Sequence, residues 1–170
     1  SQWAELFPQL QANTIQAAIC AKARYVALEN LYMVDAEDTI TESSPDGPCS
    51  VKGEVRLRMH RDLMESHLAG DLQISVLRAS DYYGPGVTAS SAGERLFGNL
   101  VKSKAAQVMV RDDCLHSFAY IEDVGRGLAA LGTAPTDQVT WGKVWLAPHA
   151  PAQTQRAWVS QVCQLLDMPT

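Results

Sequence analysis

The stretch DLQISVLRASDYYGPG, residues 71–86, decides the fold that the sequence predicts. Residues 72–77 are mostly apolar, and Gly70 stands directly before the stretch, where it would end a preceding helix. A short apolar run next to turn residues is typical of a strand buried on both faces of a parallel sheet. We therefore predict a buried strand here, with ASDYYGPG at its carboxyl end.

A second buried strand is predicted upstream, because RYVAL at residues 24–28 is short, mostly apolar and rich in strand-forming residues. Between the two strands, the chain has helical apolar spacing on two faces. One face holds Val55, Met59 and Leu63, and the other Leu57, Met64 and Leu68. We predict that strands 24–29 and 72–78 lie parallel and adjacent, joined through a helix at 53–69 by a right-handed crossover.

The rest of the chain continues this alternation of strands and helices. Pro8 is predicted to start a helix over residues 8–23, since its missing N–H costs nothing in a first turn. Asp123 is predicted to precede a later helix, and Thr154 to cap the last one. The other predicted elements are a loop at 35–49, a helix at 93–102, a strand at 107–110, an extended piece at 117–120 and a strand at 143–146. Such alternation predicts an α/β sheet.

Composition excludes several classes of protein. The 170 residues are 46% hydrophobic and 19% charged, with a net charge of −5, so the chain can bury a core and does not resemble a disordered protein. No apolar run is long enough for a membrane span, and the first residues do not form a secretory signal. The lysines and arginines form no stripe that would follow a nucleic acid.

The four cysteines, at positions 20, 49, 114 and 163, have neither a zinc spacing nor a disulfide pattern. We expect them to be buried small side chains in a cytoplasmic protein. His60 and His67 are predicted to be surface or interface residues, and His116 a loop residue with no acidic partner.

Three stretches carry a resemblance to a known family: LRASDYYGPG at 77–86, FAYIEDVGRGLAAL at 118–131 and GKVWLAPHAPAQTQRAW at 142–158. With NTIQAAICAKARYVALENLYM at 13–33, the sequence resembles the NAD-dependent epimerase/dehydratase family, the extended short-chain dehydrogenases/reductases. The resemblance implies a partial Rossmann-type, doubly wound parallel sheet. Residues 1–90 would form the C-terminal half of the Rossmann-like core, and 91–170 a smaller region like the family's substrate domain.

The resemblance implies NAD or NADP as the cofactor, but one part of the family's pattern is missing. Its members begin with a strand, a GxxGxxG turn and a helix, where glycines let the backbone approach the pyrophosphate. No such run occurs in these 170 residues. We therefore expect that this chain alone does not bind the cofactor.

The resemblance also places the family's catalytic groups on altered residues. The tyrosine and lysine of its Tyr-x-x-x-Lys motif fall on Lys52 and Arg56, and its serine falls on or beside Asn30. An arginine does not release its proton near neutral pH, so these three positions are candidates for a catalytic site that has been altered. Lys52 could serve as an acid or base only if burial lowered its pKa by several units.

The segment after the second strand gives further candidates. By resemblance, Ala79 and Ser80 lie where the family's backbone passes the nicotinamide, and Asp81 and Tyr83 would face the substrate. A structural interpretation stays open for each of them: Asp81 would cap a turn, and Tyr83 would be a packing residue.

Two functions remain open at this stage. The first is a truncated epimerase, dehydratase or reductase that is unable to catalyse alone. The second is a non-catalytic remnant that oligomerises or binds small molecules. In the family, the helices at 8–23 and 53–69 pair with their copies in a second subunit, and both helices here have a second apolar face. We therefore predict a homodimer or higher homo-oligomer, without nucleic acid or membrane as a partner.

Overall fold

A computed structural model describes residues 2–35, 39–108, 111–136 and 139–168. Contacts divide the chain into two units, each made of two segments. The first unit comprises residues 1–78 and 127–146, and the second comprises residues 79–126 and 147–170. Each unit has its own sheet pairing and its own packed side chains.

The first unit is built on a parallel sheet of three strands in the order β1-β2-β6. These strands are β1 (Tyr25–Glu29), β2 (Ile74–Arg78) and β6 (Val144–Leu146). Tyr25 lies opposite Ile74, and the register continues to Glu29 opposite Arg78. The predicted parallel neighbours at 24–29 and 72–78 are therefore confirmed, with α2 (Val51–Leu68) between them in the chain.

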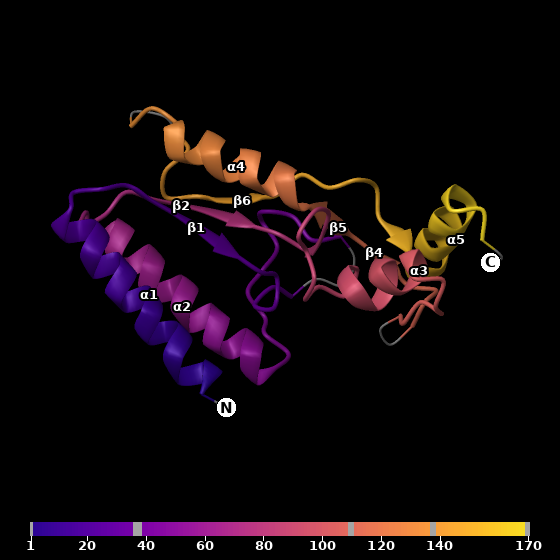
Figure 1. Cartoon of the computed structure of the whole chain (residues 1–170). Helices are drawn as coiled ribbons and strands as arrows, with labels where there is room; N and C mark the ends of the chain where they lie inside the picture. Colours follow the sequence, from indigo (N-terminus) through magenta and orange to yellow (C-terminus); the bar gives the residue numbers. More distant parts are fainter. Residues whose placement is uncertain (1, 36–38, 109–110, 137–138, 169–170) are drawn as a thin grey trace. The chain divides into compact units, whose positions relative to one another are not determined.

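Helices cover both faces of this sheet, which is why β2 is buried at all five positions. α1 (Trp3–Cys20) and α2 contact each other, and Figure 1 shows them side by side on one face. On the other face lies the part of α4 (Ile121–Thr133) that belongs to this unit. A Cβ on Gly127 would lie 3.1 Å from the Leu77 side chain, so this glycine lets α4 approach β2 closely.

The core of the first unit lies between the sheet and the first two helices. Its buried residues are Ile15, Ala27, Leu63, Leu72, Ile74 and Val76. Gly70 adopts a positive φ of 81° after α2 ends, as its predicted role in stopping the helix requires. Residues 39–48 form no helix, in agreement with the predicted loop.

The start of α1 differs from the sequence prediction, because the helix begins at Trp3 and contains Pro8 in its interior. The Trp3 and Phe7 rings contact each other at 4.9 Å, and the Arg56 guanidinium of α2 lies over both. These contacts hold the first turn in place although proline interrupts the helical hydrogen bonds. The local rule for proline was therefore overridden by packing between helices.

The apolar faces of α2 are mostly covered within the chain itself. Val55, Leu57, Met59 and Leu63 are all buried, whereas Leu68 is 82% exposed. These buried side chains need no second subunit to remove them from water. The predicted oligomer remains a prediction. Exposed large apolar side chains lie on both helices, at Leu68 of α2 and at Leu6 and Leu10 of α1.

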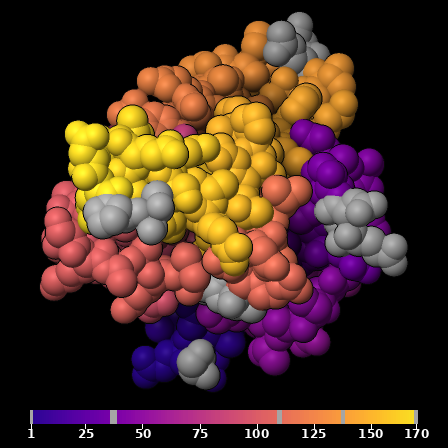
Figure 2. All heavy atoms as spheres, turned by 90° about the vertical axis from the view of Figure 1, so that its right-hand side faces the viewer, coloured from indigo at the N-terminus to yellow at the C-terminus, as the bar shows by residue number. Residues whose placement is uncertain are grey.

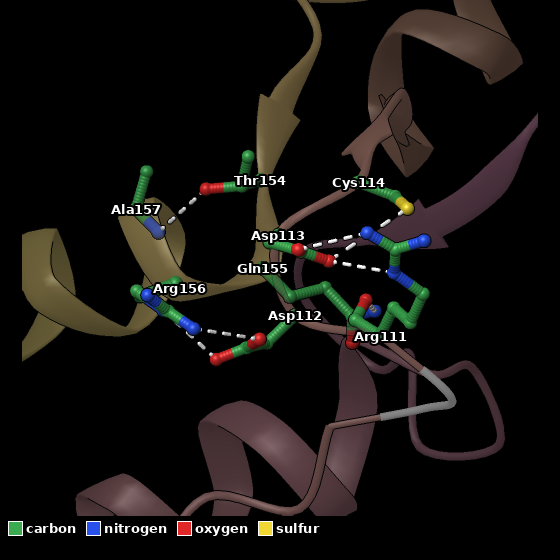
Figure 3. A network of polar contacts seen from close by, with 8 residues as sticks. All are labelled: Arg111, Asp112, Asp113, Cys114, Thr154, Gln155, Arg156 and Ala157. Atoms are coloured by element: carbon green, nitrogen blue, oxygen red, sulfur yellow. Dashed lines mark hydrogen bonds and ion pairs between the residues drawn. The ribbon is translucent and has the colours of Figure 1, made fainter.

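The second unit contains two short pairs of strands. β3 (Asp81–Tyr83) runs parallel to β5 (Phe118–Tyr120), and β4 (Leu115–His116) runs antiparallel to β7 (Gln153–Thr154). The last helix is α5 (Gln155–Leu165). Thr154 caps it as predicted, because its Oγ1 accepts a hydrogen bond from the Ala157 N–H at 3.1 Å (Figure 3).

The predicted helix at 93–102 consists of a π-helical turn, η1 (Gly93–Gly98), followed by α3 (Asn99–Val101). Figure 2 shows the atoms of this segment, in salmon, next to those of α5, in yellow. Leu96, Leu100 and Cys163 form a buried cluster between them. The expectation of buried cysteines is confirmed for Cys163 and wrong for the other three, which are exposed.

Two further sequence predictions need correction. Gln107 and Val108 form no strand, because the Gln107 N–H donates to the Arg95 carbonyl instead; residues 109–110 lie outside the described residues. Asp123 does not precede its helix but lies in the first turn of α4, where its carboxylate pairs with Arg126.

Candidate functional site

A buried polar triad lies at the carboxyl ends of two neighbouring strands in the first unit. Glu29 ends β1, Arg78 ends β2, and the sheet register places them opposite each other. Arg78 Nε donates to Glu29 Oε2 at 3.0 Å, and His60 Nδ1 lies 3.0 Å from Glu29 Oε1. Buried charges are tolerated when they are paired and hydrogen-bonded, as Glu29 is here on both oxygens.

Both histidines of α2, predicted to be surface or interface residues, are partly exposed and are also hydrogen-bonded within the chain. The His60 side chain is only 13% exposed and reaches the end of β1. His67 Nδ1 accepts from the Ile74 N–H at 3.3 Å, at the start of β2. Helical spacing alone could not show that this face of α2 meets polar groups of the sheet.

The three predicted catalytic residues are in the first unit, and their settings differ. Asn30 Oδ1 accepts from the Tyr32 N–H at 3.2 Å, which closes a local turn after β1. Lys52 is exposed in the first turn of α2. The Arg56 guanidinium lies 5.1 Å from the Trp3 ring centre and 5.0 Å from that of Phe7. A cation held against two aromatic faces contributes to the packing of α1 on α2.

A small hollow of about 150 Å³ lies beside these residues, between α1 and β1. Its polar lining includes Glu29, Arg56 and Tyr25. Burial, followed by the nearby charge of Glu29, raises the pKa of the Tyr25 phenol. Tyr25 therefore stays protonated at neutral pH and does not serve as a base.

The described residues do not fit the pyrophosphate of a dinucleotide. Such a site needs a glycine-rich turn between a strand and a helix, so that backbone N–H groups face the phosphates. β5 leads directly into α4, and β7 directly into α5, without an intervening loop. The connection from β3 to the helical turn at Gly93–Gly98 does contain Gly84 and Gly86, but not in the GxxGxxG spacing.

A second polar centre lies in the second unit, around Asp81. Asp81 Oδ2 accepts from Ser91 Oγ at 2.9 Å, and His116 Nε2 lies 3.1 Å from the same oxygen. The hydrogen bond from His116 lowers the pKa of Asp81 most; burial opposes this shift, and Ser91 adds to it. His116, predicted to have no acidic partner, thus has one that lies 35 residues earlier in the chain.

The Asp81 centre opens into a cavity of about 260 Å³. Phe118, opposite Asp81 in the register of β3 and β5, forms part of its wall, and the His116 ring lies 4.5 Å from the Phe118 ring. The Asp81 and His116 side chains are 40% and 41% exposed. Unlike the Glu29 triad, this pair can therefore contact a dissolved molecule.

Exposed ion pairs lie on the segment that borders this cavity (Figure 3). Arg111 binds Asp113 through Nε and Nη2, both at 2.9 Å, and Asp112 pairs with Arg156 of α5 at 2.9 Å. The hydrogen bonds from these arginines lower the pKa values of Asp112 and Asp113. Gln155 Nε2 adds a bond to the Arg111 carbonyl at 3.3 Å.

The other candidates from the sequence are also in the second unit. Ala79 is buried, and Ser80 Oγ is buried without a hydrogen-bond partner among the described residues. Tyr83 packs against aromatic rings, with centroids 5.3 Å from Tyr120 and 5.2 Å from Trp158. Its position in this cluster supports the packing role that the sequence left open.

Within the described part of the chain, no group of three or more histidine, cysteine or acidic residues could hold a metal ion. In the same residues, no helix has the length and apolar character needed to cross a membrane.

Comparison of structures identifies the fold. UDP-glucuronic acid 4-epimerase from Bacillus cereus, solved with NAD, superposes with a TM-score of 0.83 at 18% identity, over 95% of this chain and 52% of that one. dTDP-glucose 4,6-dehydratase from Streptomyces venezuelae gives 0.79 at 19% identity, over 99% and 52%. UDP-glucose 4-epimerase from Thermus thermophilus gives 0.73 at 16% identity, over 94% and 53%.

The chain therefore has the Rossmann-like α/β fold of NAD-dependent epimerases and dehydratases, as its sequence predicts, and it spans about half the length of these structures. No protein-family model matches the sequence, and the search of curated proteins finds no relative.

Proposed function

We propose that this chain is related to NAD-dependent nucleotide-sugar epimerases and dehydratases, and that it does not catalyse their reaction by itself. The observation that carries this proposal is the setting of Lys52 and Arg56 on α2, where the resemblance places a tyrosine and a lysine. Arg56 is held against Trp3 and Phe7, and Lys52 is exposed.

Neither side chain suits the proton transfer that the family's tyrosine performs. A general acid or base works best when its pKa lies near the working pH. Arginine stays protonated at every physiological pH, and lysines that act as bases are buried away from water. The exposed Lys52 has no such burial. Asn30, beside the position of the family's serine, has its side-chain oxygen in a backbone turn.

We further propose that NAD or NADP, the cofactor implied by the fold, is not bound by this chain alone. The fit described above supports this, because no described strand-to-helix connection has the GxxGxxG spacing that brings a backbone close to the pyrophosphate. The 1–90 segment, which includes Asp81, would correspond to the C-terminal half of a nucleotide-binding core, and the 91–170 segment to a substrate-binding region.

The alternative is a non-catalytic protein that oligomerises or binds small molecules, and two observations favour it. Leu6 and Leu10 of α1 are 61% and 64% exposed, one helical turn apart. Among the described residues, β1 pairs with β2 on one side and with no strand on the other, so this edge can pair with a second chain. A homodimer through α1 in the cytoplasm is the form we propose, and the exposed free cysteines suit a reducing compartment.

The decisive experiment is calorimetric titration of the full chain with NAD and with NADP, followed by assays with UDP-glucose and dTDP-glucose. We expect no binding in the low micromolar range and no turnover. The matched variant is Lys52→Tyr with Arg56→Lys, which restores the family's residues at these positions. It should also be inactive, because the pyrophosphate would still have no site. Tight NAD binding or turnover by the unaltered chain would contradict the proposal.

A further inference from the structure

The cavity beside Asp81 has hydrogen-bond acceptors that no described residue uses. Both donors that reach the carboxylate, Ser91 Oγ and His116 Nε2, meet the same oxygen, Oδ2. The other oxygen, Oδ1, accepts no hydrogen bond from the described residues. An ionised carboxylate can accept at both oxygens, so Asp81 is left with an open acceptor.

The histidine of this pair offers a second acceptor. Because an ionised carboxylate only accepts hydrogen bonds, the nitrogen of His116 that faces it carries the hydrogen. In the neutral ring the other nitrogen, Nδ1, then has a free lone pair. No bond from the described residues reaches Nδ1. The site therefore presents two acceptors and lacks a donor partner for them.

The charges around the cavity add up to one negative charge. Arg111 is neutralised by Asp113, and Arg156 by Asp112. With neutral His116, Asp81 is the remaining charge, and the whole chain is also acidic, with a net charge of −5. An anionic ligand would meet a like charge here, whereas a cation would be attracted.

We propose that this cavity binds a small organic cation, a primary ammonium or a guanidinium group, through Asp81 Oδ1 and His116 Nδ1. The apolar part of the ligand would lie along Phe118 and Leu115, which also line the cavity. Its volume of about 260 Å³ is slightly below the roughly 300–1,000 Å³ of sites for drug-sized molecules, so the ligand is small. The site lies wholly in the second unit and does not depend on the proposed lack of catalysis.

The test is a nuclear magnetic resonance titration of the full chain with three ligands of one shape: benzylamine, benzyl alcohol and benzoate, at constant ionic strength. We expect benzylamine alone to shift the backbone signals around Asp81, Ser91 and His116. Asp81→Asn should weaken benzylamine binding at least about tenfold, as expected for loss of a charged hydrogen bond. The matched control, Asp62→Asn on the exposed face of α2, should bind like the unaltered chain.

Equal shifts with all three ligands, or tighter binding of benzoate, would overturn the proposal. So would unchanged affinity in Asp81→Asn. If that variant did not fold, the ligand series on the unaltered chain would still decide. NAD titration tests the proposed function separately, so either proposal can fail without the other.

Discussion

The two units of this chain each contain a carboxylate paired with a histidine, and the third partner of each pair differs. In the first unit, Glu29 and His60 are joined by Arg78, and all three side chains are nearly buried. In the second unit, Ser91 is the third partner and donates to Asp81, and the Asp81 and His116 side chains are both about 40% exposed. The same chemical pair thus stands in two very different environments.

This difference shows how burial and the third partner decide what a polar cluster does. Arg78 neutralises Glu29 and uses one of its oxygens, while His60 occupies the other. Both oxygens of Glu29 have a partner within the triad, which ties β1, β2 and α2 together. A hydroxyl in place of the arginine leaves Asp81 with its charge and one open oxygen, which a ligand can use.

The largest expected effect is that of Glu29→Gln. This change leaves the Arg78 guanidinium, which is 5% exposed, without its counter-charge. Removing one partner of a buried ion pair costs about 3–5 kcal/mol. Urea denaturation should show this loss in the free energy of unfolding. The matched variant Asp81→Asn should lose no more than about 1 kcal/mol, since its pair is half exposed. Equal losses would remove the distinction between the two pairs.

Replacing the two histidines should also destabilise the first pair more than the second, but the difference in stability should be smaller than for the two carboxylates. His60→Gln would leave Glu29 Oε1 buried without its partner, which costs about 1–3 kcal/mol. His116→Gln leaves Asp81 in contact with water, so we expect a loss below about 1 kcal/mol. Thermal unfolding of both variants checks this order. A greater loss for His116→Gln would mean that the second pair is structural.

Asp81 should make the free energy of unfolding depend on pH in the acid range. Its folded pKa is lowered below the unfolded value of 3.8, chiefly by the hydrogen bond from His116. Its contribution is therefore fully present above about pH 4 and is lost as the pH falls through the lower folded pKa. Denaturation of the unaltered chain and of Asp81→Asn should give free energies that converge as the pH falls below 4. A difference that grew in acid would contradict the direction of the shift.

The smallest effect is expected for the exposed ion pairs that border the cavity. Arg156→Gln removes the partner of Asp112, but neither group is shielded from solvent. Exposed pairs gain little over their interactions with water. We expect an unfolding midpoint equal to that of the unaltered chain within error. A clear drop would show that this pair holds α5 in place.

How much of the structure the sequence could predict depends on how far apart in the chain the contacting residues are. The parallel strands, the stop at Gly70 and the cap at Thr154 follow from neighbouring residues, and all are confirmed. The Glu29–Arg78 pair joins residues that are 49 apart in the chain, and the pair of Asp81 with His116 joins residues 35 apart. Periodicity carries no signal for such pairs.

One signal for the triad was nevertheless present in the sequence. Glu29 and Arg78 each stand at the end of an apolar strand, and two parallel neighbours place such ends side by side. The start of α1 shows the opposite case, because a sound local rule for Pro8 was overridden by Trp3, Phe7 and Arg56 packing together. The exposure of Lys52 and the engagement of Arg56 likewise depend on α1 and could not be read from α2 alone.

The most direct test of this account is urea denaturation of the unaltered chain, Glu29→Gln and Asp81→Asn, each with and without saturating benzylamine. A ligand that binds only the folded protein raises its free energy of unfolding. We predict that benzylamine stabilises the unaltered chain and Glu29→Gln by equal amounts, although Glu29→Gln starts from a much lower stability, and that it does not stabilise Asp81→Asn. Stabilisation of Asp81→Asn by benzylamine, or its loss in Glu29→Gln, would contradict the division between a structural triad and a binding pair.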